Sequence, residues 1–212
     1  MTEMMKQLQK IGIVPVVVLD RAEDALPLAE RLMKGGLPCA EVTFRTAAAE
    51  ESIRKISKAY PDMIVGAGTV LTCEQADRAI DAGAKFIVSP GFNPKVTEYV
   101  LKKGMPMTPG VCTPTEIEAA MSLGLDVLKF FPAEPSGGLK MIKAVCAAYV
   151  NLQFMPTGGI NAENVKEYLK YDRIVACGGS WMVSGALIKE GKFDEIEKLV
   201  REAAGIVKEM RG

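Results

Sequence analysis

The chain has 212 residues, of which 49% are apolar, and its 26 basic residues balance 26 acidic ones. This length can form one domain with a substantial core. The balanced charge excludes an overall field that would attract nucleic acid or anionic lipid, so a small metabolite is the expected partner. The chain has no histidine, which excludes Ser–His and Cys–His nucleophiles and imidazole-based zinc sites.

Targeting and redox signals are also absent from the sequence. The first twenty residues lack a signal-peptide pattern, and no apolar run approaches the roughly 20 residues that span a bilayer. The five cysteines are odd in number and too widely spaced for a zinc motif or a disulfide framework. We therefore expect free thiols in a reducing, cytoplasmic compartment and no membrane partner.

Short apolar runs alternate with helical patterns along the whole chain. After a short amphipathic helix over Met4–Lys10, the runs are four to six residues long in most cases, as expected for strands buried on both faces. The predicted strands are Val14–Leu19, Cys39–Phe44, Met63–Ala67, Phe86–Ser89, Pro106–Thr108, Asp126–Phe131, Leu152–Pro156 and Arg173–Cys177.

The stretches between these runs place apolar residues three or four apart, which predicts amphipathic helices, and several end at a glycine. The predicted helices include Ala22–Lys34, Ala47–Ala59, Cys73–Ala82, Pro94–Lys103, Pro114–Ser122 and a final helix over Phe193–Met210.

Eight strands, each followed by a helical stretch, predict a parallel α/β fold, namely a single (β/α)8 TIM barrel over residues 1–212. The short N-terminal helix would precede this barrel, and the C-terminal helix would cover its wall. The alternative is an open doubly wound sheet, but no Gly-x-Gly-x-x-Gly motif follows the first strand.

Two predicted strands carry charged residues where a barrel strand should be apolar. In the second strand Glu41, Thr43 and Arg45 alternate with apolar residues and therefore share one face, which we expect to be the lumen. In the sixth strand Lys129 stands among apolar neighbours and points to the same side as Phe131. Functional groups of such barrels lie at the carboxyl ends of the strands.

Lys129 is the main candidate for chemistry. Desolvation favours the neutral form of a buried amine, and a neutral amine is a nucleophile toward carbonyl carbon. Glu41 could then move a proton during imine formation. The alternative is a buried Lys129–Glu41 pair with a purely structural role, although such pairs rarely stabilise a core more than apolar packing does.

Two glycine clusters, Thr157-Gly158-Gly159 and Gly178-Gly179-Ser180, follow the seventh and eighth predicted strands. Loops at these positions are the usual phosphate site of this fold, and glycine lets the backbone approach the anion closely. Either cluster alone could be a tight turn. Arg45 is either a carboxylate clamp or a surface charge, and Thr69 could help to hold the same anion.

These segments together resemble the 2-keto-3-deoxy-6-phosphogluconate (KDPG) and 4-hydroxy-2-oxoglutarate (KHG) aldolases. The resemblance extends in unbroken order from about residue 12 to residue 191. Its motifs are Glu41-Val42-Thr43-Phe44-Arg45-Thr46, Val65-Gly66-Ala67-Gly68-Thr69-Val70, Ser89-Pro90-Gly91, Lys129-Phe130-Phe131-Pro132-Ala133-Glu134, Pro156-Thr157-Gly158-Gly159-Ile160 and Gly178-Gly179-Ser180-Trp181.

The resemblance implies a homotrimeric class I aldolase of the Entner–Doudoroff pathway that needs no cofactor or metal. Lys129 would form the Schiff base, and Glu41 would be the acid–base group. KDPG would be cleaved to pyruvate and glyceraldehyde 3-phosphate, and KHG to pyruvate and glyoxylate. The implied substrate-binding residues are Arg45 and Thr69 for the pyruvate carboxylate, Pro90 and Phe131 for the pyruvyl pocket, and Thr157, Gly158, Gly159, Gly179 and Ser180 for the phosphate end.

Two other functions remain open at this stage. One is a phosphosugar isomerase or epimerase, which needs a base and a phosphate site on the same barrel but no imine. The other is a catalytically inactive barrel that binds a phosphorylated metabolite. Lys129 within an apolar strand is the feature that distinguishes an aldolase from both. Asp20, Asp126 and Glu134 are interpreted as solvated or capping carboxylates, too few for a metal site.

Overall fold

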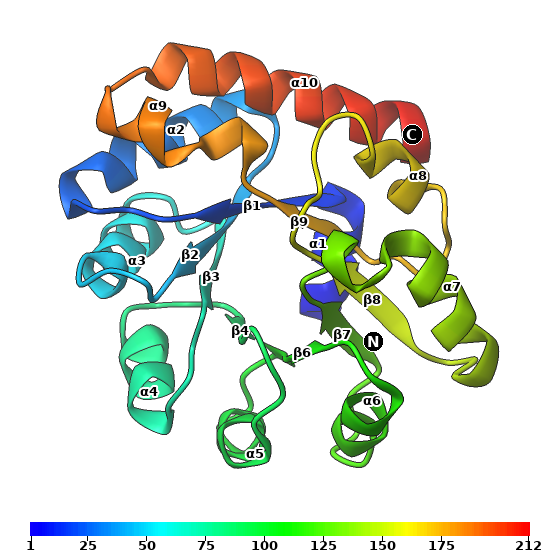
Figure 1. The fold of residues 1–212 in the computed structure, drawn as a ribbon. Coiled ribbons are helices and arrows are strands. Elements are labelled where there is room, and N and C mark those ends of the chain that lie inside the picture. Colours follow the sequence, from blue (N-terminus) through cyan, green and yellow to red (C-terminus); the bar gives the residue numbers. More distant parts are fainter.

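A computed structural model describes residues 1–212 and shows a ring of parallel strands surrounded by helices (Figure 1). All recorded strand ladders are parallel. The strands are β1 (Ile13–Val17), β2 (Cys39–Thr43), β3 (Ile64–Gly68), β4 (Ile87–Val88), β5 (Met107–Thr108), β6 (Gly110–Val111), β7 (Val127–Phe130), β8 (Gln153–Pro156) and β9 (Cys177–Gly179).

The strands form an arc β5-β4-β3-β2-β1-β9 and an arc β6-β7-β8. β5 and β6 occupy one barrel position and are separated only by Pro109, which has no N–H to continue a ladder. The other ends of the arcs meet through two isolated bridges, Phe154 with Ile174 and Thr157 with Gly178. The nine short strands therefore make eight barrel positions, and the predicted (β/α)8 barrel is confirmed.

Helices cover the outside of the barrel, and several begin at the residues that the sequence indicates. Thr72 caps one helix, and Asn93 caps the next one ahead of Pro94, whose missing N–H costs nothing at a helix start. The α-helices are α1 (Glu3–Ile11), α2 (Ala25–Gly35), α3 (Ala49–Ala59), α4 (Cys73–Asp81), α5 (Pro94–Lys102), α6 (Pro114–Met121), α7 (Gly138–Ala148), α8 (Val165–Leu169), α9 (Gly185–Lys189) and α10 (Phe193–Arg211), and three short 3₁₀ helices are η1 (Ala22–Asp24), η2 (Glu134–Ser136) and η3 (Trp181–Val183).

Two clusters of buried apolar residues fill the molecule. The larger one has 49 residues and joins the outward side chains of the strands to the helices, so burial of this layer fixes the helices on the barrel. The smaller one fills the lumen near the amino ends of the strands, where Met5 and Leu8 of α1 pack against Val127 and Met155. The carboxyl ends of the strands are thereby left for the polar groups.

The C-terminal helix has the covering position that the sequence predicts, and the position of the N-terminal helix is a further finding. α1 closes the amino end of the lumen, and α10 runs along α2, as Figure 1 shows. Arg31 on α2 donates to Glu197 on α10 at 2.9 Å. No helix of the structure has the length and apolarity needed to cross a bilayer.

The last barrel strand differs from the prediction. The sequence predicts a strand over Arg173–Cys177, but the ladder with β1 covers Cys177–Gly179, and Arg173 lies in a turn. Glycine has a low strand propensity, so the sequence pattern favours the apolar residues before Gly178 and Gly179 as the strand. Gly178 and Gly179 are needed because a Cβ at either position would overlap Thr157 or Trp181.

Candidate active site

The centre of the site is a buried amine and a buried carboxylate that meet from two strands. β7 presents Lys129, which is 4% exposed, and β2 presents Glu41, which is 0% exposed. The Lys129 Nζ donates to Glu41 Oε1 at 3.2 Å. The Lys129 Nζ also lies 5.2 Å from the centre of the Phe131 ring, while Glu41 Oε2 is buried without a hydrogen-bond partner. This second carboxylate oxygen is therefore free to accept a proton, or a hydrogen bond from a substrate hydroxyl.

Two glycines provide the space for this pair. A Cβ at Gly68 on β3 would overlap the Glu41 carboxylate, so the absence of a side chain lets Glu41 lie across its neighbouring strand. Gly110 on β6 pairs in register with Lys129, and a Cβ there would overlap the carbonyl of Pro90. Thr69 follows Gly68 directly and has a φ of 56°, an uncommon conformation for a β-branched residue. Thr69 and Pro90 thus lie next to residues that pack against or pair with the two charged positions, although neither lines the main cleft.

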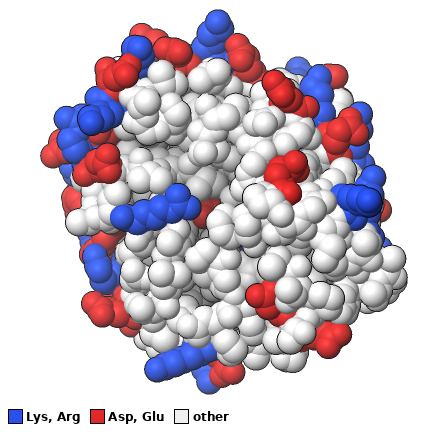
Figure 2. Space-filling view, viewed as in Figure 1, with Lys and Arg blue, Asp and Glu red and all other residues white.

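A cleft of about 540 Å³ lies at the carboxyl ends of the strands. Neither Lys129 nor Glu41 lines it, but Phe131, whose ring lies close to the Lys129 Nζ, does. Figure 2 shows a hollow near the centre of this face, with most of the charged side chains around its periphery. Arg45 reaches this cleft from the end of β2, is exposed, and makes no hydrogen bond or ion pair with another residue. The predicted site residues that line the cleft are Arg45, Phe131, Thr157, Gly158, Gly159, Gly179 and Ser180.

The loop after β8 has the geometry of an anion site. Gly158 and Gly159 both have positive φ values, 100° and 82°, which glycine adopts without strain. The N–H groups of Gly158, Gly159 and Ile160 have no acceptor within the protein, and neither does the N–H of Ser180. These unpaired donors line one cleft, so together they could bind a phosphate.

The carbonyl groups of the same loop are held on its other side. Thr157 O accepts from the Ala133 N–H at 2.8 Å, and Gly158 O accepts from the Glu134 N–H at 3.0 Å. Gly159 O accepts from the Asn164 side-chain amide at 2.9 Å. Because each of these carbonyls is held by a hydrogen bond, the planar peptide group fixes the orientation of the free N–H that follows it.

Sequence reasoning missed part of this supporting structure. Glu134 is exposed, as predicted for a solvated residue, and it also accepts a hydrogen bond from the Tyr168 hydroxyl of α8 through its Oε1. Burial and this carboxylate raise the pKa of Tyr168, so the phenol remains a donor near neutral pH. The only signal in the sequence is that Glu134 follows the Lys129 strand directly and so lies at the same rim.

Thr43, expected on the luminal face, donates to Val17 O at 3.0 Å and is fully buried. It therefore joins β2 to β1. No group of three or more His, Cys, Asp or Glu side chains is arranged to hold a metal ion. The groups available for chemistry are the Lys129 amine and the Glu41 carboxylate, together with the donors of the cleft.

The fold and the site together define a class of protein, namely a (β/α)8-barrel enzyme with a buried amine–carboxylate pair and a cleft at the carboxyl ends of its strands. The family model "KDPG and KHG aldolase" matches residues 4–199. The chain belongs to the KDPG and KHG aldolase family.

Individual relatives resemble the chain over nearly its whole length. The 2-dehydro-3-deoxy-phosphogluconate aldolase of Haemophilus influenzae is 50% identical over 206 residues, which cover 97% of each chain. A crystal structure of KDPG aldolase from Legionella pneumophila, with pyruvate captured as a covalent carbinolamine intermediate, has a TM-score of 0.91 and 37% identity and covers 94% of this chain and 97% of its own. The Zymomonas mobilis aldolase with 3-phosphoglycerate has a TM-score of 0.88 and 37% identity and covers 95% of each chain.

Proposed function

We propose that this protein is a class I aldolase that cleaves KDPG to pyruvate and glyceraldehyde 3-phosphate, with cleavage of KHG to pyruvate and glyoxylate as a second reaction. The observation that carries the proposal is the Lys129 Nζ, which is buried in the barrel 3.2 Å from Glu41. The Phe131 ring lies between this amine and a cleft whose lining residues include several with unpaired N–H groups. Relatives that match nearly the full chain are named as aldolases of this type.

In the proposed mechanism the Lys129 amine attacks the C2 ketone of the substrate, and the carbinolamine loses water to form an iminium ion. Glu41 takes the proton that the amine loses in the attack and donates it to the departing water, and the resulting carboxylate accepts the proton of the C4 hydroxyl. The iminium then takes up the electron pair of the breaking C3–C4 bond, and the aldehyde leaves. Glu41 passes the proton of the C4 hydroxyl to C3 of the enamine, and hydrolysis of the resulting imine releases pyruvate and regenerates Lys129.

The remaining residues bind the two ends of the substrate in this proposal. Arg45 and Thr69 hold the carboxylate, and Pro90 and Phe131 shape the space around the pyruvyl group. Arg45 supports this role because its guanidinium lines the cleft without a protein partner. The N–H groups of the Gly158–Gly159 loop and of Ser180, with Thr157 and Gly179 beside them, bind the phosphate.

Borohydride reduction in the presence of pyruvate, followed by peptide mass mapping, tests the proposal. We expect a stable adduct on the Lys129 peptide, and no adduct when pyruvate is omitted. The Lys129→Arg variant should lose both trapping and cleavage, because a guanidinium does not form the imine. Lys95→Arg, a change of an exposed lysine outside the site, should keep both.

The same experiments separate the other two functions. An isomerase or epimerase should retain substantial activity in Lys129→Arg, because its reaction involves no imine. An inactive barrel should bind a phosphorylated ligand but show neither turnover nor trapping. Either result would contradict the aldolase proposal.

Assembly and location are further proposals. The family resemblance favours a homotrimer, which sedimentation equilibrium of the purified protein tests. Five unpaired cysteines are compatible with a cytoplasmic location, where thiols stay reduced.

A further inference from the structure

Glu134 stands at an unusual place for a carboxylate. It follows β7 in η2, and its N–H holds the carbonyl of Gly158 at 3.0 Å, which places it directly behind the proposed phosphate loop. A Cβ at Gly159 would lie 2.6 Å from the Glu134 Cβ, so this side chain packs closely against the loop backbone. A free carboxylate at this place would repel a phosphate dianion in the cleft.

Tyr168 determines where that carboxylate lies. Tyr168 lies on α8 and is buried, with 2% of the residue exposed. Its hydroxyl donates to Glu134 Oε1. Glu134 does not line the cleft, although the loop that it touches does. The hydrogen bond therefore keeps the Glu134 side chain behind the loop.

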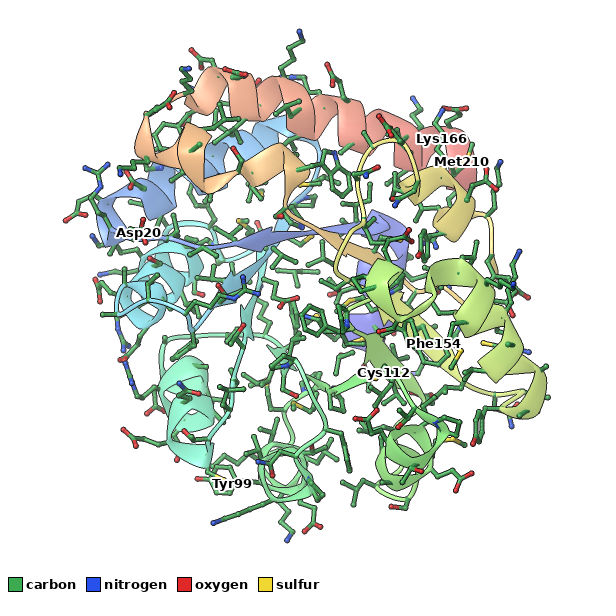
Figure 3. The ribbon with its side chains drawn as sticks, viewed as in Figure 1. Asp20, Tyr99, Cys112, Phe154, Lys166 and Met210 are labelled. Atoms are coloured by element: carbon green, nitrogen blue, oxygen red, sulfur yellow. The ribbon has the colours of Figure 1, made fainter.

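The helix that carries Tyr168 is itself fixed from the outside. Lys166 on α8 donates to Glu209 on α10 at 2.7 Å, and Figure 3 shows Lys166 beside Met210 at the same edge of the molecule. On its other side α8 begins right after Asn164, whose amide holds Gly159 O. The phosphate loop is thus supported from η2 and from α8, and the Glu134–Tyr168 hydrogen bond joins these two supports.

We propose that the Glu134–Tyr168 hydrogen bond sets the affinity of the active site for the phosphate group of its substrate, an inference that rests on the proposed aldolase function. Neither residue touches the substrate, so both are positioning residues. They act by holding the free N–H groups of the Gly158–Gly159 loop in the cleft and by keeping a negative charge away from it. Pyruvate binding and the chemistry at Lys129 do not depend on them.

The Tyr168→Phe variant tests this proposal because it removes the hydroxyl and keeps the ring. We expect the KM for KDPG to rise about tenfold, which corresponds to the loss of one hydrogen bond, with kcat changed by less than about twofold. The pyruvate concentration that gives half-maximal borohydride inactivation should stay at the wild-type value. A purely structural defect would instead raise both the KM for KDPG and the pyruvate concentration for half-maximal inactivation. It would also lower the melting temperature together with activity.

Two changes at Glu134 give an independent test. Glu134→Ala removes the acceptor and the contact with Gly159, so it should raise the KM for KDPG as Tyr168→Phe does. Glu134→Gln keeps an oxygen that accepts from Tyr168 and removes the charge, so its KM should equal or fall below that of the wild type. This rescue by the conservative variant is not expected if the carboxylate serves only general stability.

Tyr149→Phe is a matched control. Its hydroxyl donates to the Glu118 carboxylate at 2.8 Å on the outer surface, so the same kind of hydrogen bond is lost outside the site. Both kinetic quantities should be unchanged in this variant.

An unchanged KM for KDPG in both Tyr168→Phe and Glu134→Ala would overturn the proposal. So would an equal weakening for KDPG and pyruvate. Failure of the wild-type protein to trap pyruvate at Lys129 would instead contradict the proposed function itself, so the two failures are distinguishable.

Discussion

Thr69 is the one residue other than glycine with a positive φ. A β-branched side chain in this conformation costs about 1–3 kcal/mol, a strain found mostly where the surrounding structure needs a particular side chain. Thr69 directly follows Gly68, over which the Glu41 carboxylate lies, so we assign the strain to the proposed role of its hydroxyl in binding the pyruvate carboxylate.

Replacement of Thr69 by glycine should separate stability from binding. We expect the free energy of unfolding to stay equal or to rise by up to about 1 kcal/mol, since the strain is relieved while the unfolded chain becomes more flexible. Urea denaturation measures this change. The concentration of pyruvate for half-maximal borohydride trapping should rise because the hydroxyl is lost, whereas Thr69→Ser should retain wild-type trapping. Unchanged pyruvate binding in Thr69→Gly would contradict the role assigned to Thr69.

Glu41→Gln tests the acid–base role at the same scale. The amide has the shape of the carboxylate but cannot accept a proton in the same way, so kcat should fall by about 10²–10⁴-fold. Steady-state cleavage of KDPG measures the effect, and Glu98→Gln on the surface of α5 is the control. A kcat within about threefold of wild type would exclude Glu41 as the general acid–base group.

The site residues that can be predicted from the sequence are those that depart from the apolar pattern of buried strands or form glycine pairs after them. Lys129 and Glu41 stand out because charged residues are rare in buried strands, and the two glycine pairs stand out because they follow late strands. Tyr168 could not be found this way, since a tyrosine on an amphipathic helix is an ordinary core residue. Its pairing with Glu134 depends on the packing of α8 against η2, which joins residues 34 positions apart.

Helix starts are the element-scale feature that local sequence determines best. Thr113 and Glu116 form a capping box at α6, as a Thr followed three residues later by Glu predicts. Glu116 Oε2 accepts from the N–H groups of Cys112 and Thr113, each at 2.9 Å. Desolvation opposes ionisation of this carboxyl, but the hydrogen bonds outweigh it and lower the pKa of Glu116 below its ordinary 4.5.

This capping box should make a pH-dependent contribution to stability. A lowered pKa in the folded state means that the contribution is complete above the ordinary value of 4.5 and is lost as the pH falls through the lowered value. Glu116→Gln should therefore reduce the free energy of unfolding by about 1 kcal/mol at pH 7, with a smaller difference below pH 4. Urea denaturation of both proteins at the two pH values measures it. A difference that grows on acidification would show that the sign is wrong.

Element boundaries were least predictable where glycine or proline interrupts regular structure. The predicted strand Pro106–Thr108 contains only β5, and β6 on the other side of Pro109 was not predicted. The last strand lies several residues later than its apolar pattern indicated. In both cases the position of the strand is set by neighbours across the barrel rather than by local propensity.

At the scale of the whole molecule, Arg211 ties the end of the chain to its beginning. Its guanidinium donates to the carbonyls of Gln9, Ile174 and Val175 at 2.7–2.9 Å, and burial lowers its pKa. Arg211→Met should destabilise the protein by about 3 kcal/mol, because three carbonyls lose a charged donor. Thermal or urea unfolding measures the loss.

Lys208→Met, at an exposed position on the same helix, is the control for Arg211 and should change stability by less than about 0.5 kcal/mol. Equal effects of the two substitutions would mean that only the charge of α10 matters. The sequence predicted α10 as a covering helix but could not assign this clamp, because its acceptors are backbone groups far away in the chain.

The way the barrel closes has a consequence for how substrate affects it. β8 and β9 meet only through isolated bridges, so this is the seam of the ring, and the proposed phosphate donors lie on both of its sides. A bound phosphate would therefore accept hydrogen bonds from residues on both sides of the β8–β9 junction and so link its two sides. Amide hydrogens around this joint should exchange early in the free enzyme and slowly under saturating substrate, which at a hundred times the Kd stabilises the fold by about 2.7 kcal/mol.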